Sequence, residues 1–483
     1  MKRLLMVYSA ALLHTTAVAQ HWSNVGLGPA GIGPTQVKCL YGDTVMDRLL
    51  AGGQFFKYRN DVDTVWAFSR AQWNGARWDS LGSRVQPGSG SGEIAPEVYW
   101  YLRYQGNLYT CGDFGFSTPG GYNSNIARLD APTMQWEDLG CLSTVPNGLR
   151  TLVPKEPQET LYATGFADIL CGQFPPTCVY SYDGSTFVRW APFDQFPEVP
   201  LTHVTYIFEF RGKTYMVGVF PGPGGQGVAS FLRFNGSVWE LVPGWNNLMA
   251  SIWDYTIRND TLYVGGDFLE VNGGPGNLVA SFDGEQWNNL GGGFRCNDCW
   301  SAGSVNALQW FNGELWACGM FDQVLDIPAH GIAKWDGQRW CVLPGGFLQA
   351  SLVGSPLYDM TVWRDSLYMC GLFESVDGVP AHQIVQWIGG DAVEDCSTVG
   401  IGETVPPTGL VVSPIAEPGR WAVHFPKEGS WVLAAYDAIG RMVDRWHVVG
   451  STVVIDLGNR PLGLYLLRTG TPEGAWYSAK VLR

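Results

Sequence analysis

The chain has 483 residues, of which 46% are apolar and 15% are charged, and its formal net charge at pH 7 is -14. This composition excludes a disordered chain, because enough apolar surface is present to form a sizeable core. The excess of acidic side chains leaves no general basic surface for a phosphate backbone, so nucleic acid is not expected as a partner. The 62 Gly and 29 Pro residues favour many short strands over helices.

The N-terminal segment, residues 1–19, has the pattern of a secretory signal peptide. Two basic residues, Lys2 and Arg3, precede a largely apolar stretch, and an A-x-A cleavage pattern ends at Ala19. The mature chain is therefore expected to begin at Gln20. No later stretch is apolar for about 18 uninterrupted residues, so no transmembrane segment is expected.

A motif of the form L-Y-V-G-G-x-F, followed by W-D-G-x-x-W-x-x-L-G, recurs along the chain, and its clearest copy begins at Leu262. The phenylalanine that ends the first half returns about every 50 residues, at Phe55, Phe114, Phe166, Phe220, Phe268, Phe321 and Phe373. Each unit has the pattern of four short strands joined by turns such as Asn-Gly and Asp-Gly, whose central positions need positive φ. Seven such units predict an all-β fold, a seven-bladed β-propeller over residues 20–390.

The two ends of the repeat array complement each other. The seventh unit runs through Ile384 to Trp387 but lacks the final W-x-x-L-G strand. A segment that resembles this strand, His21 to Gly28, precedes the first unit. We therefore expect the N-terminal strand to complete the seventh blade and close the propeller, which removes the exposed edges of an open array.

These units resemble the Trp- and Gly-rich, kelch-like repeats of secreted bacterial proteins. The resemblance implies a propeller but no particular activity, because propellers host enzymes and inert scaffolds alike.

The composition changes after the repeats. Residues 391–409 are rich in small and turn-forming residues and are expected to form a linker, and residues 410–483 alternate apolar and polar residues like the strands of a small Ig-like β-sandwich. Four ordered segments in this region resemble the C-terminal sorting domain of the type IX secretion system: Tyr436 to Arg441, Val454 to Leu457, Gly463 to Tyr465 and Lys480 to Leu482. The resemblance implies that the secretion machinery is a partner and that the protein is secreted or held at the outer-membrane surface of a Gram-negative bacterium. An accessory sandwich without a sorting role is the alternative.

Few residues stand outside the repeat pattern as candidates for ligand binding. His330 and His382 occupy equivalent repeat positions, five residues before a tryptophan, and would lie on one rim. Trp245 and Trp300 fall in loops, where exposed indole rings can stack on sugar faces or anchor protein partners. The alternative is that these rings fold back on the propeller. No catalytic residue, metal site or cofactor is predicted, because the sequence holds no G-x-S-x-G, H-E-x-x-H or P-loop motif.

The eleven cysteines form an odd number, so at least one has no partner within the chain. Two pairs are close enough in sequence to close small loops, and disulfides are expected there in an exported protein: Cys171 with Cys178, and Cys296 with Cys299. A metal or redox role for the C-x-x-C pair is the alternative. Three further cysteines share one repeat position and are expected to be buried thiols: Cys111, Cys318 and Cys370.

Taken together, these patterns predict a secreted or cell-surface, non-catalytic binding protein with a glycan or protein ligand. A secreted polysaccharide hydrolase on the same scaffold is the competing class, and it would need two carboxylates outside the repeat pattern near the central channel. A structural surface component is the third class.

Overall fold

The computed structural model describes residues 21–31, 35–84, 86–87, 96–115, 125–139, 149–155, 160–168, 177–190, 203–221, 228–246, 250–299, 301–325, 327–343, 347, 357–389, 394–396, 411–415, 419–437, 441–461, 463–470 and 476–482. The expected signal peptide lies outside them. The chain divides into two compact units, residues 1–398 and 399–483. Among the described residues, no helix is long and apolar enough to cross a membrane.

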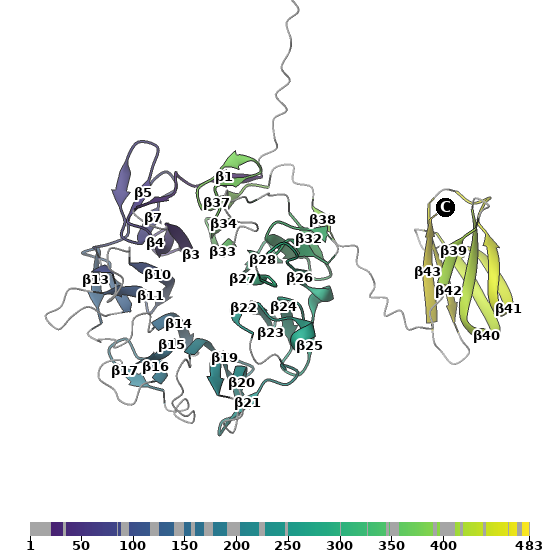
Figure 1. The fold of residues 1–483 in the computed structure, drawn as a ribbon, viewed down its shortest axis with the longest axis horizontal. Helices are drawn as coiled ribbons and strands as arrows, with labels where there is room; N and C mark the ends of the chain where they lie inside the picture. Colours follow the sequence, from purple (N-terminus) through teal and green to yellow (C-terminus); the bar gives the residue numbers. More distant parts are fainter. Residues whose placement is uncertain are drawn as a thin grey trace, which may run out of the picture. The chain divides into compact units, whose positions relative to one another are not determined.

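The first unit is all-β, and its antiparallel sheets follow one another around a ring (Figure 1). The first strand of each repeat contacts the first strand of the next, and the last of them contacts the first, which closes the ring of contacts. In chain order these inner strands are β3 (Gln36–Asp43), β10 (Glu97–Tyr104), β14 (Leu149–Lys155), β18 (His203–Phe210), β22 (Ile252–Arg258), β27 (Ser304–Phe311) and β33 (Leu357–Trp363).

The other strands of each repeat add outward in sequence order. The second strands are β4 (Arg48–Gln54), β11 (Asn107–Gly115), β15 (Thr160–Asp168), β19 (Lys213–Pro221), β23 (Thr261–Gly266), β28 (Glu314–Met320) and β34 (Ser366–Gly371). The third strands are β7 (Arg70–Trp73), β12 (Ile126–Asp130), β16 (Thr177–Tyr182), β20 (Val228–Phe234), β24 (Val279–Phe282), β31 (Ile332–Trp335) and β37 (Ile384–Trp387). The fourth strands are β8 (Trp78–Ser80), β13 (Gln135–Asp138), β17 (Phe187–Arg189), β21 (Trp239–Leu241), β25 (Trp287–Asn288) and β32 (Trp340–Val342).

Shorter strands and 3-10 turns lie in the loops between these strands. They are β2 (Pro29–Ala30), β5 (Lys57–Arg59), β6 (Thr64–Trp66), β9 (Gln86–Pro87), β26 (Phe294–Arg295), β29 (Gln323–Val324), β30 (Ile327–Pro328), β35 (Ser375–Val376) and β36 (Val379–Pro380), with 3-10 turns at Glu270–Asn272 and Leu290–Gly292. The hairpins β5–β6, β29–β30 and β35–β36 all precede the third strand of their repeat.

The seventh repeat receives its fourth strand from the start of the chain. The strand β1 (Trp22–Asn24) pairs with β37, and Trp22 lies opposite Trp387. The Trp22 side chain is fully buried, with ring centroids 4.8 Å from Trp387 and 5.5 Å from Phe347. This strand therefore contributes a large apolar side chain to the interior of the last repeat.

Adjacent repeats are joined by tryptophan side chains of the fourth strands. The Nε1–H of Trp136 donates to the carbonyl of Leu81 in the preceding repeat (2.7 Å), and Trp340 donates in the same way to Leu290 (2.9 Å). In each case a glycine in the left-handed region follows the acceptor, with φ +78 at Gly82. A Cβ on Gly82 would lie 2.5 Å from the Trp136 Nε1, so only glycine fits. The W-x-x-L-G motif thus encodes a contact between repeats.

The same contact links the N-terminal segment to the first repeat. The Nε1–H of Trp78 donates to the carbonyl of Val25, three residues after Trp22 in the N-terminal segment (3.0 Å). Gly26 follows Val25 with φ +77, and a Cβ there would lie 2.7 Å from the Trp78 ring. The N-terminal segment therefore meets the first repeat as each fourth strand meets the repeat that follows it.

A bulge interrupts the pairing of the first and second strands of each repeat. In the sixth repeat the register shifts between Val305 and Ala307, opposite Gly319. A Cβ on Gly319 would lie 2.1 Å from the carbonyl oxygen of Ser304, which explains the second glycine of the L-Y-V-G-G-x-F motif.

The first unit continues past the seventh repeat. The strand β38 (Asp395–Cys396) pairs with the outer edge of β32, and a disulfide joins Cys396 to Cys341. These residues lie within the range that the sequence analysis assigns to a linker. The backbone pairing and the disulfide attach them to the sixth repeat, whereas nearly all the rest of residues 391–409 lies outside the described residues.

The second unit is a set of antiparallel strands, β39 (Val411–Pro414), β40 (Arg420–Tyr436), β41 (Met442–Asp456), β42 (Leu464–Gly470) and β43 (Trp476–Leu482). The first half of β40 pairs with β39 and its second half with β42, and both halves pair with β41. A register irregularity between His424 and Gly429 separates the two halves of this long strand. One apolar core, including Val423, Leu433 and Leu467, receives side chains from both halves.

We predict that Trp22→Ala lowers the free energy of unfolding by about 3–5 kcal/mol, because a fully buried indole is removed from the last repeat. Trp66→Ala is the matched control: that ring is 55% exposed, so its loss costs less than about 1 kcal/mol. Chemical denaturation of both variants measures the difference. Equal stability of the two variants would contradict the packing of β1 into the core of the seventh repeat.

Candidate functional site

The inner strands β22 and β33 each carry an aspartate just after the bulge, at equivalent register positions. Asp254 Oδ2 accepts the backbone N–H of Leu308 on the next inner strand (2.7 Å), and its Oδ1 accepts the N–H of Tyr255 (2.8 Å). Asp359 repeats this arrangement with Leu40 of β3 (2.7 Å) and with Met360 (2.8 Å). Both carboxyl groups therefore connect neighbouring inner strands.

The surroundings of these two carboxyl groups favour the protonated form. Both side chains are half-buried. Burial raises the pKa of Asp254 to about 7 and that of Asp359 to about 8, and the charge of Asp254 adds to the rise at Asp359. The backbone N–H donors oppose the shift without cancelling it.

A hydrolase would need two carboxyl groups free to act on substrate. The carboxyl oxygens of Asp254 and Asp359 instead accept backbone N–H groups. These hydrogen bonds assign both carboxyl groups to holding neighbouring inner strands together.

We predict that Asp359→Asn gains stability relative to the parent as pH rises from about 4 to about 8. The unfolded carboxyl ionises near pH 4, whereas the folded group keeps its proton to about 8, so the folded state binds more protons in this window and stability falls with rising pH. Asparagine does not titrate, so the Asp359→Asn variant does not lose this stability as pH rises. Thermal unfolding at several pH values measures the difference between the two melting temperatures.

Asp336→Asn is the control for this experiment. Burial is the largest single influence on the pKa of Asp336 and raises it, but the backbone N–H donors of its turn and the Arg339 side chain together outweigh burial and lower the pKa. The contribution of this group is therefore already complete above pH 5. Its difference from the parent should stay level between pH 5 and 8. A level difference for Asp359→Asn over pH 4–8 would contradict the assigned role.

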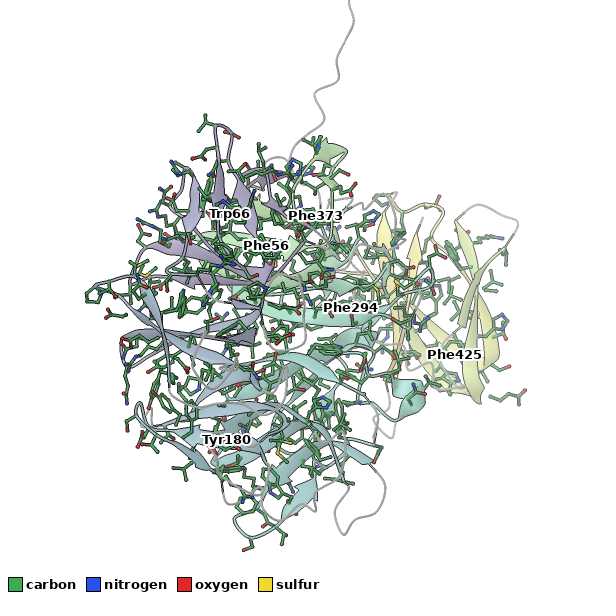
Figure 2. All side chains as sticks on the ribbon, turned by 60° about the vertical axis from the view of Figure 1, so that its left-hand side comes forward. Phe56, Trp66, Tyr180, Phe294, Phe373 and Phe425 are labelled. Atoms are coloured by element: carbon green, nitrogen blue, oxygen red, sulfur yellow. A yellow bond between two sulfur atoms is a disulfide. The ribbon has the colours of Figure 1, made fainter. Side chains whose placement is uncertain are left out.

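An exposed face of aromatic and basic side chains lies on the β5–β6 hairpin of the first repeat, and Figure 2 labels Trp66 and the nearby Phe56. Lys57 and Trp66 are cross-strand partners, as are Arg59 and Thr64, while Tyr58 between them is fully buried. Strand alternation therefore presents Lys57, Arg59, Thr64 and Trp66 on one side. We call these four residues the hairpin face.

The hairpin face continues as a stack of rings and cations. The Lys57 Nζ lies 4.0 Å from the centroid of the Trp66 ring, and Trp66 stacks on Phe68 at 5.4 Å with an interplanar angle of 16°. The Arg84 guanidinium lies 4.6 Å from the centroid of Phe68. The stack keeps Lys57 beside the Trp66 ring, which is 55% exposed, and Arg84 beside the half-buried Phe68 ring.

The interpretation of Trp245 as an exposed loop ring is wrong. Its side chain is 1% exposed, and its Nε1–H donates to the Ser230 hydroxyl (3.0 Å). Its ring packs against Phe231 at 5.4 Å and Phe268 at 5.0 Å. The loop folds back on the core because these apolar contacts and a satisfied indole N–H are available there. Trp300 lies outside the described residues, so its role stays a prediction.

The two histidines differ in their surroundings. His330 is exposed, whereas His382 is half-buried and its backbone N–H donates to Asn24 Oδ1 (3.0 Å). Burial lowers the pKa of His382, and the charge of Arg59 lowers it further. Phe68 of the first repeat occupies the same repeat position as His330 and His382. Each of the three is followed by a residue with positive φ, namely Ser69, Gly331 and Gln383. The equivalent of the two histidines in the first repeat is therefore part of the stack on the hairpin face.

The structure bears on the predicted disulfides and on the predicted buried thiols. Cys296 is disulfide-bonded to Cys299. Cys171 lies outside the described residues, so its pairing with Cys178 stays a prediction. The three cysteines at the shared repeat position are all fully buried, and burial raises the pKa of each thiol: Cys111, Cys318 and Cys370.

One group with metal-ligating geometry occurs among the described residues. It comprises Cys341, Glu394 and Cys396, with ligand atoms within 4.8 Å of one another. Both cysteines are used in the Cys341–Cys396 disulfide, so neither offers a thiolate.

A buried arginine interrupts the core of the first repeat. Arg70 lies opposite Gly52 at a position that other repeats fill with Ile332 or Ile384. The Arg70 side chain is almost fully buried, since the residue is 1% exposed. Its guanidinium lies 5.1 Å from the ring centroid of Phe114 and 4.7 Å from that of Trp136. Burial lowers the pKa of Arg70 to about 9. The two rings hold this cation at the boundary between the first and second repeats.

No family model and no curated protein matches the chain. Three solved structures illustrate the structural similarities. PorZ, a surface component of the type IX secretion system of Porphyromonas gingivalis, has 10% identity and a TM-score of 0.38 over 90% of this chain and 69% of its own. The extracellular domain of a hybrid two-component system from B. thetaiotaomicron has 10% identity and a TM-score of 0.43 over 96% of this chain, which spans 59% of that chain. The dihydro-heme d1 dehydrogenase NirN has 12% identity and a TM-score of 0.30, with 90% and 80% covered. At TM-scores below 0.5, none of these similarities assigns a function to this chain.

Proposed function

We propose that the chain is a secreted or cell-surface, non-catalytic binding protein built on a seven-bladed β-propeller closed by its N-terminal strand. The closed ring of contacts among the inner strands and the pairing of β1 with β37 support the propeller. The signal-peptide pattern and the two described disulfides support an exported protein, because disulfides persist in oxidising compartments.

The observation that carries the binding role is the hairpin face. The tryptophans of the fourth strands and the half-buried Asp254 and Asp359 have places in the fold, since they join neighbouring repeats. The exposed Trp66 and the basic side chains beside it do not extend the core, and exposed aromatic and basic side chains are typical of interaction surfaces.

The sorting role of the second unit is a further part of this proposal. Residues 399–483 form a compact unit of their own, and the ordered segments named above resemble a type IX sorting domain. A small Ig-like sandwich is proposed for this unit, supported by the two pairing partners of β40 and its single core.

The binding role is tested with residues 20–483 on a panel of glycans and surface proteins, scoring retention and release of reducing ends in the same wells. We expect retention without release. Release of sugar ends would overturn the proposal in favour of the hydrolase. Absence of both would favour a structural surface component.

The sorting role is tested by expressing the full chain, and a chain that ends at Thr398, in a bacterium with a type IX secretion system. We expect only the full chain to reach the surface or the medium, and a secretion-deficient strain to retain it in the periplasm. Equal export of the shortened chain would contradict a sorting role for the second unit.

A further inference from the structure

The hairpin face concentrates positive charge on an acidic protein. Lys57 and Arg59 lie on it two residues apart, and Arg84 covers the adjoining Phe68 ring. Within the described part of the chain, no carboxylate pairs with any of the three. Two acidic residues, Asp61 and Asp63, lie in the turn of the same hairpin rather than on its strands, and Asp63 is engaged by Arg77 (3.1 Å). The cations of the hairpin face therefore remain available to a negatively charged partner.

The backbone at this place departs from the repeat. Ser69 has positive φ, as do the equivalent Leu278 and Gln383, but Phe68 is also in the left-handed region, with φ +43. A bulky residue in that conformation is strained, and strain of this kind is retained where the surroundings or a function select it. Here it places the Phe68 ring against Trp66, which extends the exposed stack.

We propose that the hairpin face binds an acidic polysaccharide, with carboxylates of the sugar on Lys57, Arg59 and Arg84 and a sugar ring against the exposed part of Trp66. This inference rests on the proposed binding function and names its ligand class. It follows from charge complementarity together with an exposed indole, since each alone is common on protein surfaces.

An acidic peptide fits this surface less well. Peptides are commonly held by strand addition to a sheet edge or by a groove that takes side chains. The sheet order is β2–β5–β6, so its described edges are β6, with three residues, and β2, with two, and both are short for strand addition. A polyanionic glycan needs neither, because its charges and ring faces repeat along the chain and match cations spaced along a hairpin.

The experiment measures binding of polygalacturonate to residues 20–483 by titration calorimetry at low and physiological salt. Lys57→Gln/Arg59→Gln and Trp66→Ala are each expected to weaken binding by about tenfold or more, as hot-spot losses do. The matched control is Arg211→Gln/Lys213→Gln, which removes the same two charges at the same spacing in the fourth repeat and is expected to leave affinity within about twofold. Circular dichroism verifies that every variant is folded.

Three outcomes would overturn the inference. The first is no binding of polygalacturonate while other glycans or proteins bind, and the second is binding that the hairpin variants leave unchanged. The third is equal, hairpin-dependent binding of poly-glutamate, which would assign the face to acidic peptides. All three leave the proposed binding function standing, whereas failure of the whole panel would remove it.

Discussion

The structure depends on one hydrogen bond that recurs in several repeats, at Trp78, Trp136, Trp287 and Trp340. A tryptophan on the fourth strand donates its indole N–H to a backbone carbonyl of the preceding repeat, next to a glycine that leaves room for the ring. The same bond joins Trp78 to Val25 of the N-terminal segment, so the last repeat, completed by β1, is linked to the first. Buried carbonyls that lose their donor are costly, which explains why both the tryptophan and the glycine recur in the motif.

Residues that make contacts between repeats can be distinguished from residues that are free for function. The inner strands use Asp254 and Asp359 to satisfy backbone N–H groups of their neighbours, and burial makes these carboxyl groups hold protons near neutral pH. The hairpin face has no such task. Function is accordingly proposed for a loop-borne surface held by the repeated sheets, a common arrangement in proteins.

The sequence predicts much of the fold because the motif records local requirements. Asp-Gly turns, the glycine opposite each bulge and the tryptophan before Leu-Gly each meet a steric or hydrogen-bonding need that any repeat must satisfy, as Gly319 and Trp340 illustrate. The disulfide between Cys341 and Cys396 was not predictable in this way, because it joins positions far apart in sequence and only the folded chain brings β38 to the edge of β32. The exposure of Trp245 was predicted wrongly for a related reason, since a loop position in the sequence does not indicate that the loop folds back on the core. The hairpin face did leave a signal, the polar–apolar–polar alternation of Lys57, Tyr58 and Arg59 before the turn, but pairing Lys57 with Trp66 required the register.

Hydrogen–deuterium exchange on residues 20–483, with and without polygalacturonate, tests the central claim that the repeat motif builds a closed ring and leaves the hairpin face for the ligand. The account predicts that β1 exchanges as slowly as β37 in both states, and that the ligand adds protection only between Lys57 and Phe68. Rapid exchange of β1, or ligand-induced protection of the strands that carry Asp254 and Asp359, would contradict it.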